Sequence, residues 1–346
     1  MTAKEKVVVI LGPTATGKTA CGILLAQKLK GEIISGDSML VFRGMDIATA
    51  KPTPQERALA VHHLIDVRDP EEKYSAFDFK REAASLIQEI HGRGHMTIIV
   101  VLHPLQIISA SFLNMFAASL IQEFLWRLHM PIIVGGTGLY LKALLENYHF
   151  STSEEQTKRR QALAEYADRY GNEALHQKLE KLDEETANRL KINDRRRIIR
   201  AIEAWEDGDP VSQEKDSESP FDAVVFGLTM ERALLYDRIN RRVDLMVEEG
   251  LFDEARFFYD QGIPLDSQSM KSIGYRQCVQ YFRGEWDKKT AVAKIKQATR
   301  NFAKRQITWY KKMPYIHWLM LDASPHYPSI ADKMLEVLRE RQFIEK

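Results

Sequence analysis

The segment that most constrains the fold is a phosphate-loop motif near the start of the chain. Residues Gly12-Pro13-Thr14-Ala15-Thr16-Gly17-Lys18-Thr19 match the pattern G-x-x-x-x-G-K-[ST] in full. The apolar run Val7–Leu11 before the motif predicts a buried parallel strand, and the helical spacing in Lys18–Leu29 predicts a helix after it. Strand, glycine loop and helix together predict an α/β domain that binds a di- or triphosphate.

Each part of this loop has an expected chemical role. The glycines let backbone N–H groups converge on a phosphate at the N-terminus of a helix. Lys18 supplies a positive charge to the distal phosphate, and the hydroxyl of Thr19 is the expected Mg²⁺ ligand. The residues that we predict to bind the phosphates are Gly12, Thr14, Ala15, Thr16, Gly17, Lys18 and Thr19. The motif does not reveal which group is transferred.

The rest of the chain extends this unit into a larger α/β fold. Further apolar runs at 97–101, 223–228 and 315–321 predict strands, whereas Ser151–Asp207 is polar and helical. We therefore expect a parallel sheet flanked by helices, like that of P-loop nucleoside triphosphate hydrolases, with a mainly helical inserted domain. The expected boundaries place the catalytic core at 1–148 and 221–346 and the insert at 149–220.

The sequence of one helix–strand unit occurs twice in the chain. Ala83–Glu89 recurs as Ala117–Glu123, and His95–Val100 recurs as His129–Val134 with one substitution and the same offset. Residues 101–130 are therefore interpreted as an insertion. If both strands enter the sheet, the strand order near the phosphate loop must change; if one is displaced, an apolar strand needs another partner.

Two more motifs follow predicted strands, at the sheet edge where open α/β proteins bind ligands. Asp37-Ser38 follows the strand Glu32–Ser35. Its carboxylate would bind Mg²⁺ through water or accept a proton from a nucleophile, and an exposed turn aspartate is the alternative. The second motif, Gly135–Tyr140, combines three glycines with the hydroxyl of Thr137, and alone it is a weak signal.

Charge gives two hints of a polyanionic partner. The net charge is only +1, but Met270–Lys312, the basic block, carries twelve Lys or Arg residues against Glu285 and Asp287. Arg197 and Arg200 lie at i, i+3 on one face of a predicted helix. Both features fit RNA phosphates, and both also fit a solvated helix face with salt bridges to neighbouring acids.

Composition favours a cytoplasmic protein. The two cysteines, Cys21 and Cys278, form no disulfide framework and no zinc motif, which fits a reducing compartment. The first strand begins near Lys6, which leaves no room for a signal or transit peptide. Thr97–Gln122 carries no charge, but polar residues and a proline interrupt it, so we expect a packed strand and helix with no membrane insertion.

The ordered set of motifs is more specific than any one of them. After the phosphate loop come the following motifs: Asp37-Ser38, Met45-Asp46-Ile47, Thr49-Ala50-Lys51-Pro52, His62-His63-Leu64-Ile65-Asp66, Gly135–Tyr140, Asn193-Asp194, Arg238-Ile239-Asn240-Arg241-Arg242, Ile273-Gly274-Tyr275-Arg276 and Thr299–Trp309. Over nearly the whole chain this series resembles the bacterial tRNA dimethylallyltransferase (isopentenyltransferase) family.

The resemblance implies a reaction and roles in it. A dimethylallyl group would pass from dimethylallyl diphosphate to the N6 amine of the adenosine immediately 3′ of the tRNA anticodon, giving N6-(dimethylallyl)adenosine and diphosphate. Asp37, Thr19 and Arg238 would be the catalytic residues: Asp37 as general base, and Arg238, Lys18 and Thr19 with Mg²⁺ as stabilisers of the leaving diphosphate. The chain is expected to act as a monomer on the anticodon stem-loop.

The resemblance also implies the residues that contact tRNA, which are Asp37, Ser38, Met39, Leu40, Thr137, Arg196, Arg197 and Arg200. The sequence departs from the family at three positions. Many members carry Gln where this chain has Leu40, Tyr where it has Phe42 and Gly where it has Ala48. The side chain of Leu40 cannot hydrogen-bond a base edge.

Two other functions fit parts of the sequence. A P-loop small-molecule kinase would use the same loop to bind ATP, with Asp37 activating a hydroxyl group. An RNA-binding protein with an inactive loop would explain the basic block, but the intact Lys18, Thr19 and Asp37 argue against it.

Overall fold

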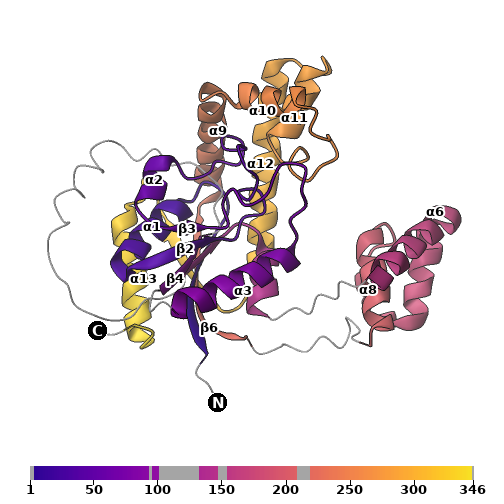
Figure 1. The fold of residues 1–346 in the computed structure, drawn as a ribbon, viewed down its shortest axis with the longest axis horizontal. Helices are drawn as coiled ribbons and strands as arrows, with labels where there is room; N and C mark the ends of the chain where they lie inside the picture. Colours follow the sequence, from indigo (N-terminus) through magenta and orange to yellow (C-terminus); the bar gives the residue numbers. More distant parts are fainter. Residues whose placement is uncertain (1–3, 93–95, 101–131, 147–153, 209–218, 345–346) are drawn as a thin grey trace. The chain divides into compact units, whose positions relative to one another are not determined.

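A computed structural model describes residues 4–92, 96–100, 132–146, 154–208 and 219–344 (Figure 1). The chain divides into two compact units, of which the larger comprises Met1–Leu145 and Ser219–Lys346 and the smaller comprises Glu146–Glu218. The structure places the boundaries between the units after Leu145 and Glu218, whereas the sequence predicted them after residues 148 and 220. Each unit has a hydrophobic core of its own.

The larger unit alternates strands and helices along the chain. Its elements are β1 (Glu5–Leu11), α1 (Lys18–Leu29), β2 (Gly31–Ser35), α2 (Pro54–Ala58), β3 (His62–His63), α3 (Ala76–Gly92), β4 (Met96–Val100), β5 (Ile132–Gly135), α5 (Gly138–Leu145), β6 (Phe221–Met230), α9 (Arg232–Glu248), α10 (Leu251–Asp260), α11 (Tyr275–Phe282), α12 (Lys288–Tyr310), β7 (Ile316–Leu321) and α13 (Tyr327–Glu340). Helix α3 begins at Ala76, where Ser75 and Asp78 cap its start reciprocally.

Six strands form one parallel sheet in the order β4-β2-β5-β1-β6-β7. The predicted parallel sheet is therefore confirmed. Because all strands run the same way, their carboxyl ends meet at one edge. The phosphate loop after β1, Asp37 after β2 and Gly136 after β5 all lie at this edge.

Both copies of the repeated strand enter the sheet, and they pair with opposite sides of β2. Ile98 of β4 and Ile132 of β5 occupy the same position in the two copies, and each pairs with Ile33 of β2. The second copy, β5, also pairs with β1 and leads directly into the Gly135 motif. The helix of the second copy lies outside the described residues.

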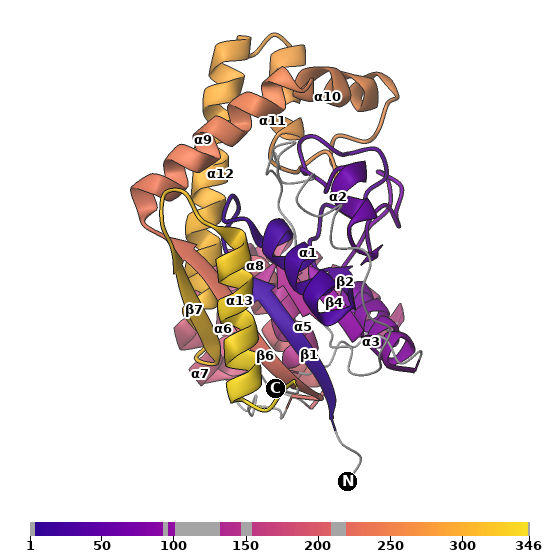
Figure 2. The ribbon, with the colours of Figure 1, turned by 90° about the vertical axis from the view of Figure 1, so that its left-hand side faces the viewer.

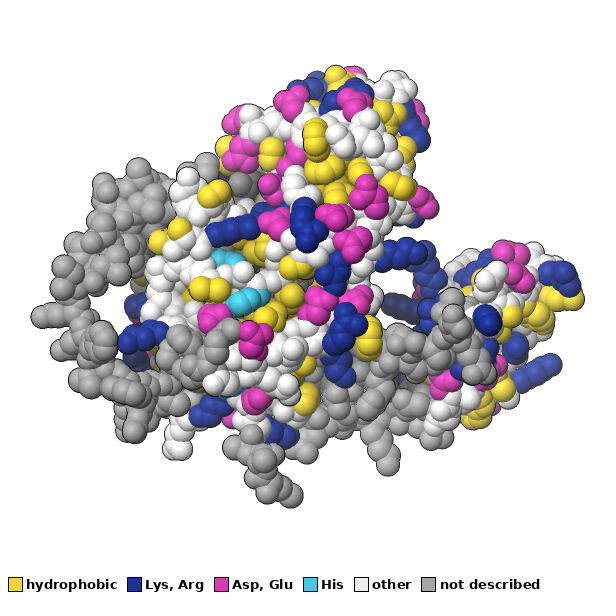
Figure 3. All heavy atoms as spheres, in the orientation of Figure 1, with side chains coloured by type: hydrophobic (Ala, Val, Ile, Leu, Met, Phe, Trp, Pro, Cys, Tyr) yellow, Lys and Arg dark blue, Asp and Glu magenta, His cyan; other side chains and the backbone are white. Residues whose placement is uncertain are grey.

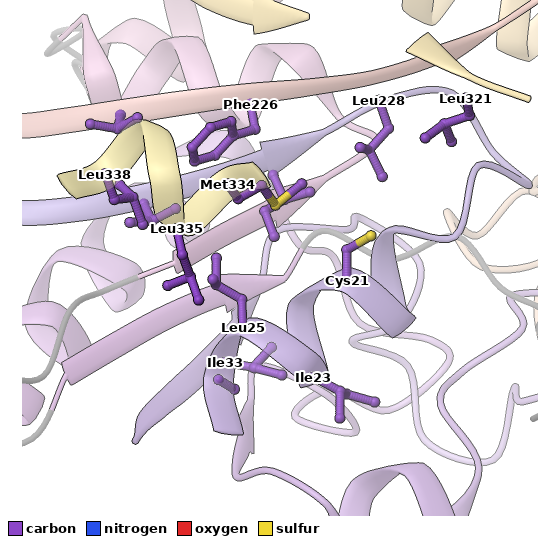
Figure 4. Packing of buried hydrophobic residues seen from close by; sticks show 14 of the residues in the cluster. Cys21, Ile23, Leu25, Ile33, Phe226, Leu228, Leu321, Met334, Leu335 and Leu338 are labelled. Atoms are coloured by element: carbon purple, nitrogen blue, oxygen red, sulfur yellow. The ribbon is translucent and has the colours of Figure 1, made fainter. Parts of the chain in front are cut away.

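Helices cover both faces of the sheet. On one face, α1 and α13 contact each other, and α1 packs across β1, β2 and β5 (Figure 2). Figure 4 shows Met334, Leu335 and Leu338 of α13 facing Phe226 of β6, with Leu25 of α1 nearby. On the other face α3 packs on α5, and the ring of Phe79 stacks on Tyr140 at 4.9 Å between ring centroids. Burial on both faces explains the continuous apolar run of β1.

The smaller unit is helical, as the sequence predicted, and consists of α6 (Glu154–Leu182), α7 (Glu184–Arg189) and α8 (Arg195–Glu206). Gly171 breaks the helical conformation of α6 at φ 88° and ψ 164°. Leu175 and Leu179 of α6 pack against Ile198 and Ile202 of α8 to form its core.

No helix among residues 4–92, 96–100, 132–146, 154–208 and 219–344 has both the length and the apolar character needed to cross a membrane. Of the uncharged stretch Thr97–Gln122, the first four residues belong to β4. Residues 101–122 lie outside the described part of the chain.

Candidate functional site

The phosphate loop leaves the N-terminus of α1 available to an anion. Gly17 precedes the helix with φ 81° and ψ 27°, a left-handed conformation that glycine adopts without strain, and no side chain caps the first turn. The hydroxyl of Thr16 donates to the carbonyl oxygen of Pro13 at 2.8 Å, which folds the loop back on itself. The uncapped N–H groups and the helix dipole therefore face the loop, as a phosphate site requires.

Lys18 is buried at the base of this loop, with 2% of its surface exposed. Its Nζ donates to the carbonyl oxygen of Pro13 at 2.9 Å. Burial, together with the charge of Arg242, lowers the pKa of Lys18 to about 7, although Asp37 opposes this shift. A bound anion would favour the charged form of the lysine.

Asp37 is buried rather than exposed in a turn, so the surface alternative is wrong. Only 3% of its surface is exposed, and its Oδ1 accepts a hydrogen bond from the backbone N–H of Met39 at 2.8 Å. Burial raises the pKa of Asp37 to about 7, against the effects of that hydrogen bond and of Lys18. A carboxylate with a pKa near neutrality is well matched to general-base catalysis.

Arg242 belongs to the site, although the sequence motif that contains it assigned it no role. It lies on α9, is 4% exposed, and its Nη1 donates to the hydroxyl of Thr14 at 2.9 Å. Its Nε and Nη2 are buried and have no hydrogen-bond partner among the described residues. Burial lowers the pKa of Arg242, the direction that an adjacent anion would oppose. The buried Lys18 and Arg242 and two unused donors of Arg242 thus lie beside the loop, and the carboxylates of Asp37 and Glu249 are both near enough to act on the charge of Arg242.

The predicted catalytic arginine also contacts the loop. Arg238 lies one helical turn before Arg242 on α9, and its Nε donates to the carbonyl oxygen of Ala15 at 2.9 Å. Ala15 has a φ of 67°, which is uncommon for a residue other than glycine. The structure therefore brings Arg238 to the phosphate loop from more than two hundred residues away in the sequence.

Helix α12 ties the phosphate loop to the Gly135 motif. Gln306 accepts from the backbone N–H of Thr14 at 3.1 Å and donates to the carbonyl oxygen of Gly136 at 2.8 Å. A Cβ at Gly136 would lie 2.6 Å from Nε2 of Gln306, so a larger residue there would displace this bridge. Thr137 donates to the hydroxyl of Ser38 at 3.5 Å, which brings these two predicted tRNA contacts together.

Residues Asp46–Ala48 are held by one carboxylate. Glu254 of α10 accepts from the backbone N–H groups of Asp46, Ile47 and Ala48 at 2.8, 2.7 and 3.2 Å. The hydroxyl of Tyr275 donates to the same carboxylate at 2.5 Å. A carboxylate has enough lone pairs for all four donors, so this arrangement fixes the segment to α10 and α11.

The three departures from the family pattern are all buried. Leu40 and Phe42 are fully buried, and the Leu40 side chain belongs to the hydrophobic core. A Cβ at Gly274 would lie 2.8 Å from the Cβ of Ala48, so the alanine fits because residue 274 is glycine. The Leu40 side chain therefore contributes packing in this structure.

The predicted arginines of the insert lie on α8, in the smaller unit. Arg196 and Arg197 are exposed, and Arg197 forms an ion pair with Asp194 at 3.1 Å. Glu203 is buried and receives two hydrogen bonds from Arg160 at 2.9 and 3.1 Å. Exposed ion pairs contribute about 0–1 kcal/mol, so the pairing of Arg197 is weak enough for a phosphate to displace it.

Part of the basic block has partners within the protein. Lys296 pairs with Asp244 at 2.6 Å, Nη1 of Arg300 donates to Asn240 at 2.6 Å, and Lys288 lies 4.9 Å from the ring centroid of Phe252. Figure 3 shows Lys and Arg side chains interspersed with Asp and Glu on the visible described surface. The block is therefore partly structural.

The residues near the loop suit a magnesium–diphosphate complex. Among the described ranges, no group of three or more His, Cys, Asp or Glu residues is placed to hold a metal. Thr19, buried in the first turn of α1, offers a hydroxyl. Mg²⁺ keeps several waters and commonly takes few protein oxygens together with substrate phosphates, so a threonine hydroxyl fits it.

Comparisons with known proteins agree with this geometry. The family described as IPP transferase matches residues 40–101 and 101–313, and its match divides where the first repeated strand ends. A tRNA dimethylallyltransferase of Halalkalibacterium halodurans is 42% identical over 320 residues, which covers 91% of each chain. One of Streptococcus thermophilus is 42% identical over 343 residues, covering 99% of this chain and 100% of the relative.

Solved structures give the same result. The tRNA isopentenylpyrophosphate transferase of Bacillus halodurans is similar with a TM-score of 0.66 and 39% identity, over 99% of both chains. A eukaryotic dimethylallyltransferase acting on tRNA has a TM-score of 0.74 and 25% identity, over 99% of this chain and 81% of that one.

Proposed function

The chain belongs to the IPP transferase family, and from that premise we propose that its phosphate loop binds dimethylallyl diphosphate. It is a tRNA-modifying transferase, and the proposed acceptor is the N6 amine of the adenosine immediately 3′ of the anticodon. The observation that carries this proposal is the buried group of Lys18, Arg242 and Asp37 beside the open N-terminus of α1. It combines a diphosphate site with a base.

The reaction requires both a site that stabilises diphosphate and a base. The adenine amine is a weak nucleophile because its lone pair is delocalised into the ring, so departure of the leaving group must contribute. As the C–O bond to diphosphate breaks, positive charge spreads over the allyl group and negative charge grows on the diphosphate. Lys18, Arg242 and Arg238 would stabilise that negative charge as the new C–N bond forms.

Asp37 would complete the proton balance. Alkylation leaves an extra proton on the amine nitrogen, and the carboxylate of Asp37 would accept it. Because burial raises the pKa of Asp37 to about 7, the group is ionised above neutrality and still basic enough for this step. Mg²⁺ held by Thr19 would supply additional charge neutralisation to the leaving diphosphate.

The acceptor must be brought to this site in an unstacked state. A base inside the anticodon-loop stack is out of reach, and enzymes that modify bases commonly flip the target nucleotide out. The proposed tRNA contacts include Arg196, Arg197 and Arg200 of α8, together with Thr137 and Ser38. A cytoplasmic, monomeric enzyme remains the expectation for such a substrate.

Family membership favours prenyl transfer over the kinase alternative, and one experiment separates them. The protein is incubated with labelled dimethylallyl diphosphate or labelled ATP, with and without unmodified tRNA. We expect label to enter tRNA from the prenyl donor alone, and Lys18→Ala to lose most of that transfer. ATP turnover that needs no tRNA would overturn the proposal in favour of a kinase.

A further inference from the structure

Tyr327 joins the phosphate loop from the far end of the chain. It follows β7 and is the first residue of α13, and its half-buried ring packs at the edge of the core cluster. Its hydroxyl accepts a hydrogen bond from Nη2 of Arg238 at 3.0 Å. The sequence motifs gave no role to this tyrosine.

The same ring lies directly on the phosphate loop. A Cβ built on Gly17 would overlap the hydroxyl and the adjacent ring carbons of Tyr327. Gly17 is therefore required twice, once for its φ of 81° and once for the space that the tyrosine fills. Tyr327 thus contacts both the loop and the arginine beside it.

These contacts fix the orientation of Arg238. Its Nε donates to Ala15 and its Nη2 to Tyr327, whereas Nη1 makes no hydrogen bond within the described residues. An arginine side chain is flexible, and a guanidinium held at two nitrogens is oriented before a ligand arrives. Donors that need no reorganisation stabilise a transition state best.

We propose that Tyr327 is a positioning residue for the leaving diphosphate. Its hydroxyl holds Arg238 against the carbonyl oxygen of Ala15, and this leaves Nη1 for the phosphate oxygens. The inference rests on the proposed function, because it concerns the same diphosphate. Tyr327 acts through Arg238.

Tyr327→Phe tests this role, because it keeps the ring on Gly17 and removes only the hydroxyl. We expect kcat to fall about tenfold, the loss that one hydrogen bond to a charged group typically causes. Inhibition by inorganic pyrophosphate should weaken, while the KM for tRNA stays unchanged. In an Arg238→Ala background the same substitution should have no further effect, because the group that it positions is gone.

His326→Ala is the matched control. His326 caps the N-terminus of α13 by accepting from the backbone N–H of Ser329, whereas Arg238 donates to Ala15 and Tyr327, so we expect loss of the His326 side chain to perturb the same helix end without changing kcat. The inference is overturned if Tyr327→Phe has the kcat of the unaltered protein, or if it slows the Arg238→Ala variant by the same factor. If the unaltered protein transfers no prenyl group, the proposed function fails instead, so the two failures are distinguishable.

Discussion

Arg242 provides a quantitative test of the buried anion site. The free-energy cost of burying its side chain without a ligand follows from its hydrogen bonds. Two of its nitrogens, Nε and Nη2, are buried without partners among the described residues. Each such group costs about 1–3 kcal/mol, so the pair costs about 4 kcal/mol. Arg242→Met keeps most of the side-chain volume and loses the hydrogen bond to Thr14, worth about 2 kcal/mol for a charged donor.

The ligand-free variant should therefore be more stable than the unaltered protein by about 2 kcal/mol. For a chain of this size that corresponds to a rise in melting temperature of about 2–4 °C. The assay is thermal unfolding with and without magnesium pyrophosphate. The unaltered protein should gain about 2.7 kcal/mol at a ligand concentration of about one hundred times Kd, and Arg242→Met should lose most of that gain.

Arg241→Met is the control for this experiment. Arg241 is the next residue on α9, is exposed, and forms an ion pair with Asp237 four residues earlier. Its replacement should change stability by about 1 kcal/mol or less and keep the full response to pyrophosphate. The reasoning is refuted if Arg242→Met melts below the unaltered protein without ligand, or if pyrophosphate still stabilises it as strongly.

Three other changes probe the site and the fold. Because the pKa of Asp37 is raised to about 7, its charged form destabilises the folded state as pH rises from about 4 to above 7, so Asp37→Asn should be the more stable protein at pH 8 in urea unfolding. The unaltered rate should fall as pH drops below 7 and this dependence should vanish with the asparagine; an unchanged pH profile would remove Asp37 from proton transfer. Glu254→Gln replaces an acceptor oxygen that binds backbone N–H groups and should cost about 2–4 kcal/mol in urea unfolding, whereas a loss below about 0.5 kcal/mol would contradict its structural role. Deletion of residues 101–134 joins the first repeated strand to Gly135 in the register of the second, so the variant should fold and transfer the prenyl group; an unfolded circular-dichroism spectrum would show that the two copies are not equivalent.

The strand, the phosphate loop and the helix after it could be predicted because each depends on residues that are close together in the sequence. The strand before Gly12 and the helix after Lys18 follow from apolar spacing and the glycine pattern, and the structure has both. The position of the repeated strand was open, because identical residues suit either side of β2 equally well. Only tertiary pairing decides between those two places.

The site residues to which the sequence assigned no role lie far from the phosphate loop in the sequence. Arg242 reads as one more basic residue beside the exposed Arg241, although its spacing to Ile239, Val243 and Met246 places it on the buried face of α9. That periodicity was the available signal for Arg242. Gln306 lies in the motif Thr299–Trp309, but the motif itself assigns it no contact, and Tyr327 lies in no motif; both roles depend on packing against the phosphate loop.

The central claim is that the phosphate loop selects an allylic diphosphate over a nucleoside triphosphate. Calorimetric titration tests it most directly, with an anticodon stem-loop present whose target adenosine is replaced by purine riboside, so that no amine can react. With Mg²⁺, dimethylallyl diphosphate should bind at one site, inorganic pyrophosphate should displace it, and Lys18→Ala should abolish the signal. Tighter binding of ATP to that same site, with no heat from the prenyl donor, would contradict the account.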